Sequence, residues 1–232
     1  MKELDVAIKA ARESGKILNR YFRKSLKVDR KRDATPVTIA DRESEKKIVS
    51  IIRKSFPDHN FLGSEFTWII DPLDMTKNFV RGIPLFSNFI TMEKDSKIIA
   101  VAYAMNIMAY AAVGKGTFVN GKKAKVSNIK DMSDAFVVFG DVHEEGTRPY
   151  TSQFFEVINK CYYNRSYGDG LGYILLAQGD VDIFLDRGKP WDVAAGKIII
   201  EETGGRDTIY SSSIIATNRR LHEAVLNIFG KR

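Results

Sequence analysis

The chain has 232 residues, a net charge of +7 and one cysteine, Cys161. This length suits one large or two modest domains, no apolar run is long enough to cross a bilayer, and the first residues lack the apolar core of a signal peptide. A single cysteine excludes an intramolecular disulfide framework, so a cytoplasmic location is expected. The positive charge would attract nucleic acid, anionic membranes or phosphorylated metabolites, although charge this diffuse more often marks a solvated surface.

The N-terminal part predicts two helices joined by a basic stretch. Apolar residues at steps of three and four predict an amphipathic helix over residues 4–22. Residues 24–33 are charged and exposed, and we consider two interpretations: a solvated loop, or a lid that brings cations to an anionic substrate. The short extended piece at residues 35–41 leads into a second helix, with Asp41 or Thr38 as its N-cap.

The most informative stretch is residues 67–79, TWIIDPLDMTKNF. Its β-branched and aromatic start predicts a buried strand, which Asp71-Pro72 should end because proline has no N–H to donate. Asp71 and Asp74 are so close that a turn can aim both carboxylates and the Leu73 carbonyl into one space. Neighbouring anions need a counter-charge, usually a hard cation with oxygen ligands. The ordinary alternative is a plain turn with Asp74 as an N-cap.

A short helix is expected directly after this turn. Residues 74–76 look like a helix start, where free N–H groups and the helix dipole favour a phosphate. The sequence therefore places a possible metal site and a possible anion site in one loop.

The rest of the chain predicts a meander followed by an α/β half. Runs at 85–92, 97–104 and 110–113, with a hairpin-type Asn120-Gly121, predict antiparallel strands. The polar connection 122–133 suggests a boundary, with residues 1–130 forming an α+β half and residues 131–232 an α/β half. In the second half, strands at 136–139, 181–185 and 214–216 alternate with helices at 152–159, 170–178, 191–203 and after Asn218.

Several carboxylates lie at the predicted ends of elements, where side chains can reach a shared cleft: Asp41, Glu65, Asp71, Asp74 and Asp192. Asp192 also suits an N-cap, and Asp186 suits a turn carboxylate. The sequence contains no nucleophile elbow, no P-loop and no CxxC motif. A carboxylate-held divalent cation is therefore the chemistry that the sequence indicates.

Taken together, these motifs resemble the inositol monophosphatase superfamily, the Mg²⁺-dependent, lithium-sensitive sugar-phosphate phosphatases. The resemblance covers almost the whole chain and implies a layered α-β-α-β-α architecture and a homodimer. The matching motifs follow in the family's order: Val37-Thr38-Ile39-Ala40-Asp41, Gly63-Ser64-Glu65, residues 68–79, the hairpin at residues 114–121, and Trp191-Asp192-Val193-Ala194-Ala195-Gly196.

The resemblance also implies a role for each site residue. Two or three Mg²⁺ ions would be held by Glu65, Asp71, the Leu73 carbonyl, Asp74 and Asp192. Asp41 and the Thr76 hydroxyl would orient the metal-activated water. The N–H groups of Met75 and Thr76 would hold the phosphate. Substrate contacts would come from Asp74, Gly168, Asp169, Gly170 and Asp186.

Two of these positions need comment. Asp169 can pair with a substrate amine, or it can simply cap the following helix. Met75 replaces a family glycine, so Met75 would be strained if that glycine uses a positive φ.

The expected activity is hydrolysis of a small polyol or sugar phosphate, first inositol 1-phosphate or fructose 1,6-bisphosphate. Residues 167–173 look more like the histidinol-phosphatase branch, which makes histidinol phosphate the alternative substrate. A non-catalytic RNA-binding protein is the other class, based on the basic residues 27–32 and 122–125, but these lack the interleaved aromatics of a stacking platform. We therefore expect a phosphate monoester as partner, and neither a membrane nor a nucleic acid.

Overall fold

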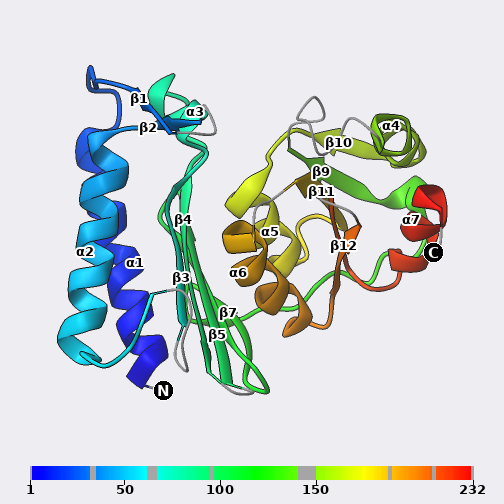
Figure 1. The fold of residues 1–232 in the computed structure, drawn as a ribbon. Coiled ribbons are helices and arrows are strands. Elements are labelled where there is room, and N and C mark those ends of the chain that lie inside the picture. Colours follow the sequence, from blue (N-terminus) through cyan, green and yellow to red (C-terminus); the bar gives the residue numbers. More distant parts are fainter. Residues whose placement is uncertain are drawn as a thin grey trace.

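The computed structural model describes residues 2–31, 35–61, 67–94, 97–140, 150–187, 190–210 and 213–230. Figure 1 shows five layers, which confirms the predicted α-β-α-β-α architecture. Helices α1 (Lys2–Tyr21) and α2 (Ile39–Ser55) cover the outer face of one sheet. Helices α5 (Asp169–Gln178) and α6 (Pro190–Glu201) lie between the sheets, and α4 (Thr151–Lys160) and α7 (His222–Phe229) cover the far face of the second sheet.

The first sheet is the predicted antiparallel meander. Its six strands are hydrogen-bonded in chain order, and each neighbouring pair is antiparallel. The strands are β3 (Thr67–Asp74), β4 (Ser87–Lys94), β5 (Lys97–Ala104), β6 (Ile107–Ala112), β7 (Gly116–Val119) and β8 (Lys122–Lys123).

The prediction that Asp71-Pro72 ends the first strand is wrong. Strand β3 continues to Asp74, with a register shift between Asp71 and Asp74 against β4. Because β3 is an edge strand of this sheet, a proline without an N–H is tolerated there. A shift of this kind bends a strand and re-aims its side chains, so it changes the direction in which these two carboxylates point.

The second sheet is mixed. Strands β10 (Tyr163–Arg165), β9 (Phe136–Phe139) and β11 (Ile183–Arg187) are parallel, and β13 (Ser213–Thr217) runs antiparallel between β11 and β12 (Arg206–Tyr210). The predicted alternation of strand and helix in this half is thus confirmed. The polar connection after β8, including the short 3-10 helix η1 (Met132–Asp134), runs from one sheet to the other.

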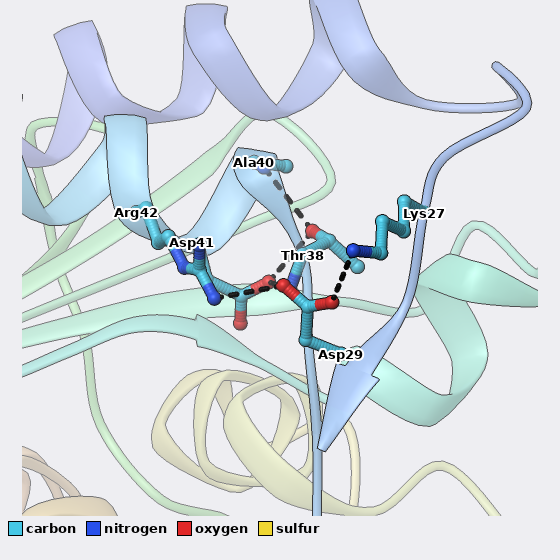
Figure 2. Close-up of polar contacts among 6 residues, drawn as sticks. All are labelled: Lys27, Asp29, Thr38, Ala40, Asp41 and Arg42. Atoms are coloured by element: carbon cyan, nitrogen blue, oxygen red, sulfur yellow. Dashed lines mark hydrogen bonds and ion pairs between the residues drawn. The ribbon is translucent and has the colours of Figure 1, made fainter. Parts of the chain in front are cut away.

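The basic stretch after α1 contains a two-stranded hairpin. Strand β1 (Asp29–Arg30) pairs with β2 (Pro36–Val37), and β2 contacts the short helix α3 (Thr76–Val80). The Asp29 carboxylate pairs with Lys27 at 3.4 Å and with Arg42 at 2.9 Å. Figure 2 shows it between these two cations. Exposed pairs of this kind stabilise little, so the hairpin is anchored weakly to α2. The proposed lid stays a prediction, and residues 32–34 lie outside the described residues.

Apolar side chains form cores between neighbouring layers. One cluster joins α1 and α2 to the first sheet, one joins both sheets to α5 and α6, and one joins the second sheet to α4 and α7.

Burial raises the pKa of the Cys161 thiol to about 12, which fits a structural residue and not a nucleophile. None of the helices in the described part of the chain is long and apolar enough to span a membrane.

Asp207 on β12 is a buried acid within the core between the sheets. Burial raises its pKa to about 7, with the Tyr173 hydroxyl and Lys197 lowering it and Glu201 raising it. Within the described residues, no hydrogen bond of ordinary geometry reaches either carboxylate oxygen of Asp207. Asp207 is therefore expected to hold a proton in the folded protein at pH values where the unfolded chain has lost it.

This proton makes stability depend on pH. Between the unfolded pKa of about 3.9 and the folded pKa of about 7, Asp207 should reduce the free energy of unfolding by up to about 1.4 kcal/mol per pH unit as pH rises. Asp207→Asn should remove this slope, so the variant should gain stability over the wild type from pH 4 to pH 7 in urea titrations. His222, whose pKa burial lowers to about 4, titrates in both proteins and cancels from the difference. A constant difference across this range would contradict the prediction.

Candidate active site

The loop from Asp71 to Thr76 gathers oxygen atoms at the end of β3. The Leu73 N–H donates to Asp71 Oδ1 at 3.1 Å, which folds the chain back on itself over two residues. The Thr76 hydroxyl lies 2.9 Å from the Leu73 carbonyl oxygen and 3.1 Å from Asp41 Oδ1. A hydroxyl has one proton, so these two acceptors compete for it. The predicted closeness of Asp41, Leu73 and Thr76 is therefore present.

Asp41 is held in place by the first turn of α2. Thr38 is the N-cap, and its hydroxyl accepts from the Ala40 N–H at 3.1 Å. The Thr38 N–H and hydroxyl both donate to Asp41 Oδ2, each at 2.7 Å, as Figure 2 shows in part. This capping box leaves Asp41 Oδ1 for Thr76. Of the two N-cap candidates in the sequence, the structure selects Thr38.

Serine side chains of α1 and α2 also fix the position of the Asp71 to Thr76 loop. The Ser44 hydroxyl on α2 donates to the Pro72 carbonyl at 2.8 Å and contacts the buried Ser14 hydroxyl of α1 at 2.5 Å. Neither serine was singled out in the sequence, because a buried serine on a helix face gives no local signal of its partner. Together they tie the loop to both outer helices.

Asp74 joins the two halves of the chain. Its side chain is 5% exposed, and its Oδ2 accepts from the Ser87 hydroxyl on β4 and from the Gly170 N–H of α5, the latter at 3.0 Å. A Cβ at Gly170 would overlap Ser87 Oγ and lie 3.0 Å from Phe89 Cζ. Glycine is thus required at residue 170 for this contact, which brings one predicted substrate residue next to a predicted metal ligand.

Asp186 lies in a narrow space between two glycines. Its Oδ2 accepts from the Asp169 N–H at 2.6 Å, and its Oδ1 accepts from the Arg187 N–H at 2.8 Å. A Cβ at Gly140 would overlap the Asp186 carboxylate, and a Cβ at Gly168 would lie 2.8 Å from Asp186 Oδ2. Gly140 is a site residue that was not singled out from the sequence. Its signal was available, since it follows a strand of the second sheet, and ligands of open α/β sheets bind at the carboxyl ends of strands.

The predicted caps of α5 and α6 need correction. Gly168 is the N-cap of α5, without a side-chain cap, so Asp169 does not serve as the cap. Asp169 instead has a φ of +59° at the first helical residue. Helix α6 begins at Pro190, which places Asp192 in its first turn and not at the N-cap.

The predicted metal ligands are only partly visible together. Glu65 and the side chain of Asp192 lie outside the described residues, although α6 itself contacts β3. Among the residues that are described, no three His, Cys, Asp or Glu side chains come together as a metal-holding group. Asp71, the Leu73 carbonyl and Asp74 supply only oxygen donors from four consecutive residues, which is the ligand type that hard divalent cations prefer.

Met75 adopts the left-handed conformation that the sequence analysis considered. It is the N-cap of α3, with φ +61° and ψ +42°. This region costs a residue with a Cβ roughly 1 kcal/mol, and glycine has no such cost. The strain sits in the loop that carries both the carboxylates and the start of α3.

Met75→Gly should therefore stabilise the protein, by about 0.5–1 kcal/mol in urea unfolding. The gain is limited by loss of the weak contact between Asn78 Nδ2 and Met75 Sδ at 3.4 Å. Gly82→Ala is the matched control, because Gly82 has φ +72° and room for a Cβ, so this change should destabilise by a similar amount. Destabilisation by Met75→Gly would contradict the strain argument.

Comparison with known proteins places this geometry in context. A family model described as the inositol monophosphatase family matches residues 1–230. The chain is 32% identical to a fructose-1,6-bisphosphatase/inositol-1-monophosphatase of Aquifex aeolicus, covering 99% of this chain and 96% of that protein. It is 35% identical to a histidinol-phosphatase of Chlorobaculum parvum, covering 88% and 84%.

A solved structure shows the same fold over the full length. The extragenic suppressor protein SuhB of Bartonella henselae superposes with a TM-score of 0.92 at 29% identity, covering 100% of this chain and 99% of that one. The layered architecture seen here is thus shared with an experimental structure.

Proposed function

Because the chain belongs to the inositol monophosphatase family, we propose that it is a Mg²⁺-dependent phosphatase of small polyol or sugar phosphates. Family membership identifies a phosphatase that acts on phosphate monoesters, and inositol 1-phosphate and fructose 1,6-bisphosphate are the proposed substrates. The observation that carries the proposal is the Thr76 hydroxyl, which lies within 3.1 Å of both Asp41 Oδ1 and the Leu73 carbonyl, beside Asp71 and Asp74.

The oxygen donors of the loop fit a magnesium site. Asp71, the Leu73 carbonyl and Asp74 would hold two or three Mg²⁺ ions together with Glu65 and Asp192. Few carboxylates are enough, since Mg²⁺ keeps several waters. When bound, Mg²⁺ lowers the pKa of water and neutralises phosphate oxygens.

The protein's own groups would orient the water and the phosphate. With its proton donated to Asp41 Oδ1, the Thr76 oxygen is left to accept a hydrogen bond from the attacking water. This arrangement also frees the Leu73 carbonyl from Thr76. The proton that the water loses would then pass through Thr76 Oγ1 to Asp41, whose orientation Thr38 fixes. The N–H groups of Met75 and Thr76 would hold the phosphate.

The second half of the chain would supply specificity. Gly140 and Gly168 make room for Asp186, which is 4% exposed and is fixed by two backbone N–H groups. Asp169 begins α5 directly beside it. Together with Gly170 and Asp74, this region would contact the hydroxyl groups of a polyol or sugar.

Histidinol phosphate is the second candidate substrate. Asp169 is the first residue of α5, and its N–H donates to Asp186 Oδ2 at 2.6 Å, so two carboxylates lie next to each other at a position where they would attract a substrate amine. The similarity to a histidinol-phosphatase supports this alternative.

A panel of three substrates tests the proposal. Purified protein should release phosphate from inositol 1-phosphate and fructose 1,6-bisphosphate with Mg²⁺, and EDTA should stop the release. A kcat/KM for histidinol phosphate at least tenfold higher would assign the alternative substrate. No release from any of the three with Mg²⁺ would refute the proposed function.

We further infer a cytoplasmic homodimer that does not need nucleic acid to act. The single cysteine supports a reducing compartment. Light scattering during gel filtration should give twice the monomer mass of 26.2 kDa, and a monomeric mass at micromolar concentration would contradict the dimer.

A further inference from the structure

A cavity lined mostly by polar and charged residues lies in the second half of the structure, away from the loop of Asp71 to Thr76. Its volume is about 440 Å³, within the range of small-molecule sites. Three segments distant in sequence line it: residues 125–128 of the connection between the sheets, residues 203–204 after α6, and residues 218–220 before α7. Asp192, a predicted metal ligand, is in the first turn of α6, whereas Thr203 and Gly204 of the cavity follow its last residue, and the helix spans about 18 Å at 1.5 Å per residue.

In the second sheet, the cavity and the candidate site also lie at opposite ends of one strand pair, β11 and β13. Asn218, at the floor of the cavity, follows the end of β13 that pairs with Ile183 of β11. Asp186 and Arg187 are at the other end of the same strand pair. A ligand in the cavity would therefore be a different molecule from the substrate of the candidate active site.

The buried side chain of Asn218 forms the floor of the cavity and is fixed by hydrogen bonds. Asn218 is 2% exposed, and its side-chain amide donates to Ser127 Oγ at 2.8 Å and to the Ile129 carbonyl at 2.9 Å. Its carbonyl oxygen accepts from the Leu221 N–H at 3.2 Å. These contacts hold two walls of the cavity together, so the shape of the cavity is set before any ligand arrives.

Three cations surround this floor. Lys125 belongs to the wall formed by residues 125–128, and Arg219 and Arg220 belong to the wall formed by residues 218–220. All three side chains are exposed. Within the described part of the protein, none of them has a carboxylate partner or a side-chain hydrogen bond. Three positive charges without an ion-pair partner around one cavity create a local potential that attracts anions.

The nearby acids are engaged elsewhere. Asp182 accepts from the Ser127 hydroxyl and, at 2.8 Å, from the Phe136 N–H. Glu202 accepts from the Gly114 and Gly116 N–H groups at 2.9 and 2.8 Å. Glu223 pairs with Arg206 at 3.1 Å. None of these three acids forms an ion pair with Lys125, Arg219 or Arg220.

We propose that this cavity binds a small molecule that carries two or more phosphate groups. A single phosphate meets one or two cations, whereas the charges here are spread over two walls of a cavity large enough for a longer anion. None of the described lining residues is aromatic, so the cavity has no platform on which nucleic-acid bases would stack. The site is independent of the proposed phosphatase chemistry.

Arg219 offers a substitution that separates binding from folding. Its backbone has a φ of +72°, in the region that favours glycine. Arg219→Gly removes one cation and relieves the backbone, so its melting temperature should not fall below that of the wild type. Lys130→Gln is the matched control, because Lys130 is an exposed cation of the same connection that does not line the cavity.

The test is calorimetric titration with inorganic tripolyphosphate in EDTA, so that no divalent ion can support binding at the candidate active site. The wild type should bind one equivalent, and Asp71→Asn and Lys130→Gln should bind equally well. Arg219→Gly should bind at least tenfold more weakly, and Arg220→Gln likewise. The proposal is overturned by absent saturable binding, by equal weakening in Lys130→Gln, or by orthophosphate binding as tightly as tripolyphosphate. Because the readout is binding without metal, it stands or fails separately from the phosphatase assay.

Discussion

Asp71→Asn is expected to reduce Mg²⁺-dependent phosphate release at least ~10³-fold, which corresponds to about 4 kcal/mol of transition-state stabilisation. Asparagine keeps the oxygen that accepts from the Leu73 N–H, so the fold of the loop should remain. It removes the negative charge that Asp71 would offer to Mg²⁺, and a neutral amide is a much poorer ligand for a hard cation. Steady-state phosphate release with saturating Mg²⁺ measures the loss, and circular dichroism checks the fold.

A matched control separates this effect from a general loss of charge. Asp58→Asn makes the same change on an exposed residue in the turn after α2 and should leave turnover unchanged. If Asp71→Asn retains more than a tenth of wild-type turnover, then Asp71 does not hold a catalytic metal, and the proposed site is wrong.

Gly170→Ala is expected to damage both stability and activity, because Gly170 of α5 lies directly against Ser87 of β4. The added Cβ would overlap Ser87 Oγ and lie 2.7 Å from Ser87 Cβ. Overpacking typically costs 1–3 kcal/mol, and displacement of the Gly170 N–H from Asp74 should cost about 1 kcal/mol more. We expect a loss of about 2–3 kcal/mol in the free energy of unfolding and of about 10²-fold in kcat/KM, since small displacements of site residues are expensive.

A double substitution tests the cause of this loss. Ser87→Gly removes the two closest atoms that the new Cβ would meet and leaves only the Phe89 ring at 3.0 Å, so Gly170→Ala should cost much less in that background than in the wild type. Urea unfolding of the four proteins gives the coupling energy. Equal costs in both backgrounds would show that the close approach between Gly170 and Ser87 is not the reason for the loss.

Much of the architecture followed from local patterns. The antiparallel meander is visible in short apolar runs separated by turn residues, and helices α1 and α2 are visible in their apolar periodicity. These features depend on the spacing of apolar residues along the chain, so a window of about ten residues contains the information needed to predict them. The spacing of Asp71, Leu73 and Asp74 belongs to the same class, because their mutual closeness is a property of four consecutive residues.

The error at Pro72 has a different origin. A proline normally ends a strand, yet β3 continues through it because β3 lies at the edge of its sheet, where one side needs no ladder hydrogen bonds. The position of a strand within a sheet is decided by all of its partners. No local pattern around Pro72 contains that information.

The amino-acid sequence by itself determined the kinds of elements, their order and the residue types available for chemistry. Only the tertiary structure decided which of them meet: Thr76 with Asp41 across 35 positions, Asp74 with Gly170 across 96, and Asp186 with Gly140. Such contacts arise when separate layers pack against one another. Their geometry depends on how entire helices and sheets pack together. It also depends on glycines such as Gly140 and Gly170, where a side chain would overlap an atom of another element.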